Sequence, residues 1–187
     1  MEKIESLYKT ENGTVLIEIK LTSILQMFNS FDPAPFHEKE LDSDAEKYIV
    51  NIVNDFPAKT RFRIIIHLPA DIADSNDAKK IVPAIHNHFQ YRMLVADMQF
   101  RSRFRFGRSA MLIGLGFLAI ALFVRFLIAS YSSQLVAQLL ADTLLIVGWA
   151  AMWEPVTILL YQLWPIIKLK RTYEKISGME IEIRSSG

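Results

Sequence analysis

A glutamate followed by a proline, Glu154 and Pro155, interrupts an apolar run long enough to cross a membrane. A carboxyl group in hydrocarbon is costly, so it marks either a helix contact or a path for ions. On a helix with about 100° between residues, Glu154 shares one stripe with small and polar residues, which are Thr143, Val147, Ala150, Thr157 and Tyr161. We do not expect such a stripe to face lipid.

Two explanations of this stripe remain open. In the first, it is a helix interface, within a hairpin or between subunits, where a protonated Glu154 bonds to its neighbours and Pro155 bends the helix by freeing the carbonyl of Ala151. In the second, several chains assemble with the stripe inward, and a ring of carboxylates lines a polar path for cations or protons. Both explanations favour a homo-oligomer.

The apolar run covers residues 109–167 and contains only three formal charges, Arg125, Asp142 and Glu154. Since roughly 20 helical residues cross a hydrocarbon core about 30 Å thick, we predict two membrane spans, over residues 110–130 and 139–164. Gly114 and Gly116 are expected to let the first span pack closely against its neighbour. Arg125 and Asp142 fall toward the far side, where we expect them to pair or to extend to the membrane surface.

Basic residues flank the two spans on one side, and the link between the spans carries no charge. These residues are Arg101, Arg103, Arg105 and Arg108 before the first span, and Lys168, Lys170 and Arg171 after the second. This distribution predicts that both termini are cytoplasmic. The arginines alternate with phenylalanines, a pattern that favours anchoring to anionic lipid over binding to nucleic acid. A net charge of +1 also gives no reason to expect nucleic acid.

The remaining sequence predicts a small cytosolic α/β domain of about three strands and two helices. Alternating apolar residues indicate strands over residues 14–21, 61–68 and 179–184. If the strand with Arg61 and Arg63 lies beside a glutamate-bearing strand, charge pairs form on the outer face; otherwise that face is simply solvated. A helix follows Ser43, which forms a capping box with Glu46, and a second helix leads through Pro83 toward the first span.

The last predicted strand follows the second span, so the fold class is an α+β membrane protein in which a two-helix transmembrane hairpin is inserted into the cytosolic domain. The expected divisions are residues 1–108 for the cytosolic domain, 109–167 for the hairpin and 168–187 for the returning segment. Movement of the hairpin would then be transmitted to the sheet.

Little in the sequence indicates catalysis, and we expect no enzyme, no cofactor and no metal site. The chain has no cysteine, which excludes thiolate chemistry and cysteine zinc sites. His86 and His88 differ by about 200° on a helix and cannot hold one ion together. Glycine-rich phosphate loops and paired catalytic carboxylate motifs are missing from the sequence.

A loop with two prolines is the most distinctive part of the cytosolic domain. Its residues Phe31, Asp32, Pro33, Pro35 and Phe36 predict a rigid segment with two aromatic anchors, suited to binding a protein partner. Together with the later Leu-Asp-x-x-Ala-x-x-Tyr-Ile and Ile-His-Leu-Pro patterns, it resembles a group of small uncharacterised bacterial membrane proteins that have an N-terminal soluble domain. The resemblance implies a bacterial origin and the same two-part layout, and it implies no activity.

These observations lead to one functional hypothesis and two alternatives. The hypothesis is a homo-oligomer of the bacterial inner membrane that couples a cytosolic domain to a two-helix membrane assembly, with a pore for cations or protons. The first alternative is a non-conducting, membrane-anchored adaptor or sensor that binds a protein partner. The second alternative is an enzyme on a membrane anchor.

Overall fold

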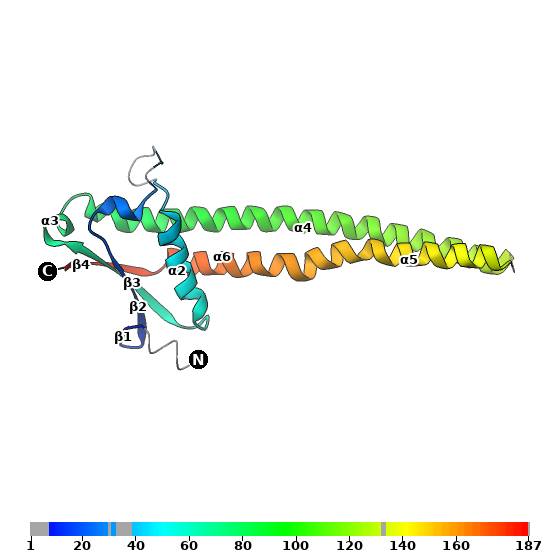
Figure 1. Cartoon of the computed structure of the whole chain (residues 1–187), viewed down its shortest axis with the longest axis horizontal. Coiled ribbons are helices and arrows are strands. Elements are labelled where there is room, and N and C mark those ends of the chain that lie inside the picture. The colour runs from blue at the N-terminus through cyan, green and yellow to red at the C-terminus, as the bar shows by residue number, and fades with distance from the viewer. Residues whose placement is uncertain (1–7, 30, 33–38, 132–133, 187) are drawn as a thin grey trace. The chain divides into compact units, whose positions relative to one another are not determined.

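The computed structural model describes residues 8–29, 31–32, 39–131 and 134–186. The chain forms two compact units, one of Met1–Val95 with Leu169–Gly187 and one of Ala96–Lys168. The fold is mixed α/β, with a small sheet in the first unit and long helices (Figure 1). The second unit is longer at both ends than the apolar run of residues 109–167, because the helices that contain this run continue beyond it.

The sheet has four strands, β1 (Thr10–Glu11), β2 (Thr14–Lys20), β3 (Arg61–Pro69) and β4 (Glu180–Ser186), in that spatial order. β1 pairs antiparallel with β2, whereas β2, β3 and β4 run parallel. The prediction of three strands was wrong by one, because a strand of two residues has no measurable alternation. Its signal is the hairpin turn at Asn12 and Gly13, which both have positive φ.

The predicted apolar residues of the strands share one face of the sheet, as expected. Ile17, Ile64 and Ile181 are aligned across three strands, and the first two are completely buried. Phe56 follows the helix α2 (Ser43–Asp55) and packs edge-on against Phe62 of this face at 5.5 Å. This face is therefore covered in part by the residue that directly follows α2.

The opposite face carries a layer of ion pairs centred on β3. Arg63 bonds to Glu180 at 2.9 Å, and Arg184 bonds to Glu182 at 2.9 Å. Glu18 of β2 accepts from Lys9 at 2.9 Å, and the pKa of Glu18 is lowered chiefly by this bond, against the effect of burial. The structure thus has paired charges rather than a merely solvated face, because β3 lies between the two glutamate strands.

The start of α2 differs from the prediction in a way that matters for the rest of the unit. Asp42, not Ser43, is the N-cap residue, and its side chain accepts from the backbone N–H of Asp44. The capping box of Ser43 and Glu46 was therefore wrong. With the cap supplied one residue earlier, the Glu46 side chain is available for contacts elsewhere.

The remaining described elements are short helices and two long helical segments. The short ones are η1 (Ile24–Met27) and α3 (Ala70–Ala73). α4 (Ala78–Tyr131) is one continuous helix of 54 residues, so the helix expected at Pro83 and the first predicted span are a single element. The second segment consists of α5 (Leu135–Thr157), a π-helical turn η2 (Ile158–Gln162) and α6 (Leu163–Ser177).

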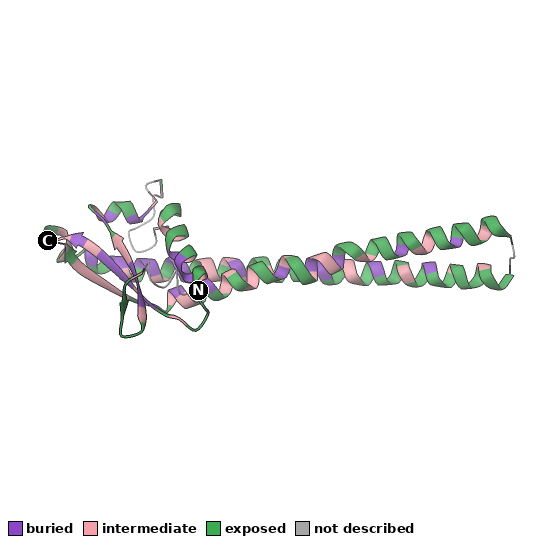
Figure 2. Ribbon diagram, turned by 60° about the horizontal axis from the view of Figure 1, so that its bottom comes forward, coloured by how far each residue is buried: buried purple, intermediate pink, exposed green. Residues whose placement is uncertain are grey.

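Within the second unit, α4 and α5 lie side by side and pack through very small residues. The buried positions recur along the contact, and the outward surface is exposed (Figure 2). They fall at every seventh residue, at Gly107, Gly114 and Ala121 of α4 and at Ala141, Gly148 and Pro155 of α5. A seven-residue repeat keeps one seam facing the partner helix over many turns. We call these six residues the seam.

The π-helical turn explains how the seam continues past Pro155. Pro155 lacks the N–H that would bond to the carbonyl of Ala151. The π turn begins three residues later, at Ile158, which is itself buried, and the buried position after it is Leu163, one residue later than a seven-residue step from Pro155 requires. A π turn adds one residue to the helix, and here it accounts for this shift.

The two glycines expected to pack closely behave differently, and they provide a matched test of the seam. A Cβ atom on Gly114 would lie 2.9 Å from Met152 Sδ and 3.3 Å from the carbonyl oxygen of Ala151, whereas a Cβ on Gly116 would have no atom within 4 Å. Overpacking of this kind costs about 1–3 kcal/mol. We therefore expect Gly114→Leu to lower the melting temperature of the detergent-solubilised protein, measured by circular dichroism, and Gly116→Leu to leave it nearly unchanged. Equal effects of the two substitutions would contradict the seam.

Candidate functional site

The first unit contains a buried polar cluster centred on Glu46 of α2. Its carboxylate accepts from Arg92 Nη2 at 2.8 Å, from Tyr173 Oη at 2.8 Å and from His88 Nε2 at 3.1 Å. His88 and Arg92 lie on α4 and Tyr173 lies on α6. One carboxylate therefore ties three helices together, and we call these four residues the Glu46 cluster.

The protonation of His88 follows from its two hydrogen bonds. The backbone N–H of Leu41 donates to His88 Nδ1 at 3.2 Å, so this nitrogen must be the unprotonated one. The hydrogen is then on Nε2, which donates it to Glu46. His88 is accordingly a neutral donor, and its side chain is only 4% exposed. Both ring nitrogens are in use, so this histidine is not free to bind a metal.

The electrostatics of the cluster favour a permanent ion pair rather than proton transfer. Burial raises the pKa of Glu46, but the hydrogen bonds from His88 and Tyr173 and the charge of Arg92 outweigh it and lower this pKa to about 2. Burial and the bond to Glu46 raise the pKa of Tyr173. The pKa of Arg92 is lowered by burial but raised overall by Glu46 and Tyr173. None of these three groups titrates near neutral pH, so the arrangement suits a structural clasp better than acid–base catalysis.

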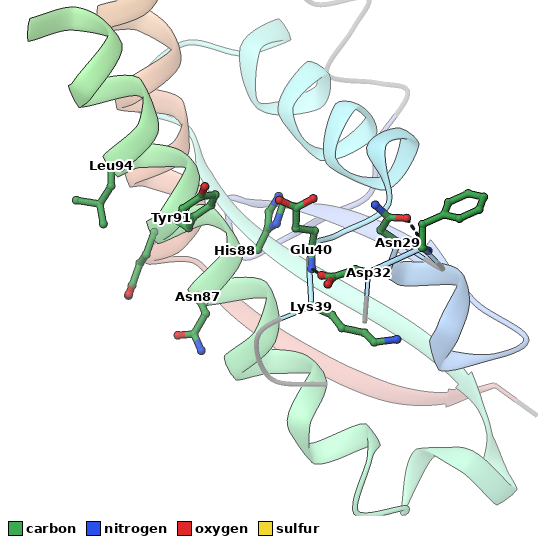
Figure 3. A pocket seen from close by; sticks show the side chains of 10 residues that line it. Asn29, Asp32, Lys39, Glu40, Asn87, His88, Tyr91 and Leu94 are labelled. Atoms are coloured by element: carbon green, nitrogen blue, oxygen red, sulfur yellow. Dashed lines mark hydrogen bonds between the residues drawn. The ribbon is translucent and has the colours of Figure 1, made fainter. Parts of the chain in front are cut away.

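A cavity of about 790 Å³ opens beside the cluster (Figure 3). On the α4 side it is lined by Asn87, Tyr91 and Leu94. On the other side it is lined by Asn29, Asp32 and Glu40, which belong to the loop before α2. This loop side is held by local bonds, since Asp32 Oδ2 accepts from the N–H of Glu40 at 2.7 Å. No group of three or more metal-ligating side chains occurs among the residues that the structure describes.

The predicted partner loop lies at this cavity only in part. Phe31 lines the cavity and is 93% exposed, and its backbone N–H is held by the side chain of Asn29. Asp32 lies at the same edge. Pro33, Pro35 and Phe36 lie outside the described residues. The described part is thus an exposed aromatic ring beside a cavity that has amide, charged and apolar groups in its wall.

The second unit contains the stripe of Glu154, and the stripe does not form the contact between the two helices. Glu154 is exposed and lines a groove of about 530 Å³ on one flank of the hairpin. Tyr161 is 71% exposed, Thr157 is half-buried, and the Thr143 hydroxyl donates to the carbonyl of Leu139 in its own helix. The seam makes the contact within the hairpin, so the stripe remains available for a contact outside the chain or for a polar path.

Apart from Glu154, the charged residues of the hairpin lie in two layers, one near each end. Arg125 Nε is 2.9 Å from Asp142 Oδ1, so these two predicted far-side charges are brought together. Near the other end, Arg103 bonds to Gln162 at 3.2 Å, and Arg101 bonds to Asp97 at 2.6 Å. Arg105, Arg108, Lys168 and Arg171 are exposed and Lys170 is half-buried. Along α4, Arg103 and Arg125 are about 33 Å apart at the usual helical rise, close to the thickness of a hydrocarbon core.

Sequence reasoning missed the Glu46 cluster, although α2 contained a signal. Glu46 shares one helix face with Ile49 and Val53, which are both buried. A glutamate on the apolar face of an amphipathic helix must be paired. The apparent capping box assigned this side chain to a different role. His88 likewise shares a face with the buried Ile81 and Ile85 of α4.

Substitution of Glu46 tests whether the cluster stabilises the first unit. Glu46→Gln removes the charge that Arg92 and Tyr173 bond to, and hydrogen bonds to charged groups contribute about 1.5–3 kcal/mol. We expect a loss of that size in the free energy of opening of β2 to β4, measured by hydrogen exchange on the full-length protein in detergent. The control is Asp44→Asn in the same helix, which loses only an exposed pair with Lys47 and should cost no more than about 0.5 kcal/mol.

The pH dependence of the same measurement is a separate prediction. The pKa of Glu46 in the folded protein, about 2, lies below its ordinary value of 4.5, so folding favours the ionised form. The resulting stabilisation is complete above pH 4.5 and disappears as the pH falls toward 2. The stability difference between the wild type and Glu46→Gln should therefore narrow over this interval. A constant difference from pH 6 to pH 2 would show that ionisation of Glu46 is not its source.

Comparisons with known proteins identify no relative of this chain. The chain matches none of the family models, curated proteins or solved structures with which it was compared.

Proposed function

We propose that the chain is a membrane protein of the bacterial inner membrane, with both termini in the cytoplasm and the second unit spanning the bilayer. α4 and the segment Leu135–Ser177 are long and apolar enough to cross a membrane. The observation that carries the proposal is the inverted packing of the hairpin. Its contact is made of the small seam residues, whereas its large apolar side chains face outward, as with Trp153 at 77% and Ile113 at 74% exposed. Such packing suits lipid, where close backbone approach drives helix association.

The charge layers support this placement. The bonded Arg103 and the pair of Arg125 and Asp142 lie about 33 Å apart along the hairpin, which matches one bilayer core of about 30 Å. Tyr161 and Trp164 lie beside the Arg103 layer and are highly exposed, as residues of an interfacial aromatic belt would be. The basic residues of this layer would bind the phosphates of anionic lipids.

Homo-oligomerisation is supported by the exposed carboxyl of Glu154. Gln162, which bonds to Arg103, lies on the same helical segment as Glu154. At the usual helical rise the two residues are about 12 Å apart, so Glu154 lies near the middle of the core. An isolated hairpin would leave this group in hydrocarbon, at a cost of a few kcal/mol. Several copies arranged with the stripe inward would hold it beside polar groups, and the ring of carboxylates would form a path for cations or protons.

Coupling between the membrane and the cytosol is the second part of the proposal. α4 and α6 each contribute residues to both units. The Glu46 cluster bonds to both helices within the first unit, through Arg92 and Tyr173. A shift of either helix in the membrane would therefore strain this cluster, and binding at the cytosolic cavity would act on α4 in the reverse direction.

A non-conducting adaptor or sensor is the alternative, and a specific observation favours it. Phe31, at 93% exposed, lies beside a cavity that is also lined by Tyr91 and Leu94, which are 54% and 55% exposed. Exposed aromatic and apolar side chains around a hollow are typical of a protein docking site. Under this alternative, Glu154 is only a contact between helices.

Membrane topology is tested by single cysteines, because the chain has none of its own. Gln134→Cys lies in the link between the two long helices and Ser75→Cys lies in the first unit. In inside-out vesicles, we expect a membrane-impermeant maleimide to label Ser75→Cys and to label Gln134→Cys only after permeabilisation. Labelling of both cysteines in intact vesicles would rule out the spanning hairpin.

Ion flux distinguishes the pore from the adaptor. Liposomes with purified protein should show cation or proton flux, and Glu154→Gln should reduce it at least severalfold because the charge in the path is lost. The oligomeric mass of both proteins is measured in the same detergent, and Asp97→Asn, outside the apolar run, serves as the control. Flux that is unchanged in Glu154→Gln would remove Glu154 from the path, and wild-type oligomers without flux would favour the adaptor.

A further inference from the structure

Two polar groups on the outer surface of α5 have no partner among the described residues. They are the carboxyl of Glu154 and the indole N–H of Trp153, and both side chains are exposed. Trp153 lies near the middle of the apolar stretch, far from the interfacial level where tryptophan is usually found. A donor and an acceptor without partners in hydrocarbon are both costly, so each needs a contact from outside the chain.

The groove beside Glu154 has room for a large aromatic side chain, since its volume is about 530 Å³. Its lining includes the small residues Ala110, Gly114 and Ala151. Phe106 and Phe117 lie in its wall, and the only carboxyl in it belongs to Glu154. The groove therefore offers a mostly apolar surface whose polar side chains are Ser109 and Glu154, and the carboxyl of Glu154 can accept from the one donor of an indole ring.

No chain can fill its own groove with Trp153. Consecutive residues of a helix point about 100° apart, and Trp153 is not among the residues that line the groove. On the helical wheel, Trp153 lies about 100° to one side of Glu154, and the groove residues Ala151 and Pro155 lie about 60° and 100° to the other side. The partner for the groove must be the Trp153 side of another molecule.

We propose that the groove receives Trp153 of a second copy of this chain, whose indole N–H donates to the carboxyl of Glu154. In a ring around the membrane normal, every copy has the same residue at the same depth. Trp153 and Glu154 differ in depth by only about 1.5 Å, so the two groups meet without any tilt or shift of the copies. The contact is heterologous, and it leaves the stripe facing the ring axis.

This inference rests on the proposed membrane placement and homo-oligomer, and it adds the surface through which the copies meet. It also orients the stripe, since Trp153 lies on one side of Glu154 and the groove residues Ala151 and Pro155 lie on the other. One oxygen of each carboxyl is then bonded at the subunit boundary and the other faces the axis. The same contact would serve the pore and the adaptor.

The environment of Trp153 provides the first test. In a protein with Trp149→Phe and Trp164→Phe, Trp153 is the one remaining tryptophan. We expect lipids brominated near the bilayer centre to quench it weakly. The reference is Leu112→Trp in a chain without other tryptophans. The helices are antiparallel, and Gly107 contacts Ile158 while Gly114 contacts Ala151. Leu112 therefore lies at the same depth as Trp153. Residue 112 is 66% exposed, and in the proposed ring it faces lipid, so its quenching should be at least twice as strong.

A double-mutant cycle provides the second test. Trp153→Phe keeps an aromatic ring but removes the donor, and Glu154→Leu removes the acceptor. Each should weaken the oligomer about threefold to thirtyfold, measured as the dissociation constant during detergent dilution, and the double mutant should be no weaker than either single mutant. Trp149→Phe is the matched control and should act additively with Glu154→Leu.

The outcomes separate this inference from the proposed function. Oligomers in which Trp153 is quenched as strongly as the reference, or in which the two substitutions are additive, would overturn the contact and leave the homo-oligomer standing. A wild-type protein that is monomeric in both detergent and bilayers would overturn the contact together with the oligomer. Weak quenching combined with non-additivity is the result that the proposed contact requires.

Discussion

The close approach of α4 to α5 is the constraint from which the other features of the hairpin follow. Three residues on each helix, all glycine, alanine or proline, recur at every seventh position and let the backbones meet. At Gly107 a Cβ would already lie 2.9 Å from Ile158 Cγ2. A seam this narrow has no room for bulky or polar groups. The large apolar side chains and the polar stripe must therefore lie on the outside, where they can be used only by lipid or by another molecule.

The two units differ in how their carboxylates are bonded. In the first unit, Glu46 accepts from three donors of the same chain, and Glu18 is paired with Lys9 and His67. In the second, Arg125 and Asp142 pair at one end, but Glu154 has no ion-pair partner among the described residues. An ordered network lowers the pKa of Glu46 because its donors are already in place. Glu154 has no such set of donors among the described residues.

Sequence reasoning reached the parts of the fold that depend on local periodicity. The alternating apolar residues of β2 and β3 and the length of the apolar run can be recognised without coordinates. Sequence reasoning missed the Glu46 cluster, which joins distant segments. Glu46 and Tyr173 are far apart in the chain, and no local sequence pattern near either residue predicts the bond between them. The short strand β1 and the exact N-cap were missed for a different reason, since two or three residues carry too little pattern to choose between adjacent alternatives.

The seam also supplies a reason for the proline that follows Glu154. Pro155 is a seam residue, and the π-helical turn begins three residues after it. Fixing Pro155 toward α4 fixes Glu154 about 100° to the side. The carboxyl is thereby turned away from the seam and lines the groove on one flank of the hairpin, about 12 Å along the helix from Gln162, the partner of Arg103. Pro155 thus makes the contact within the chain, and Glu154 is directed toward a molecule outside the chain.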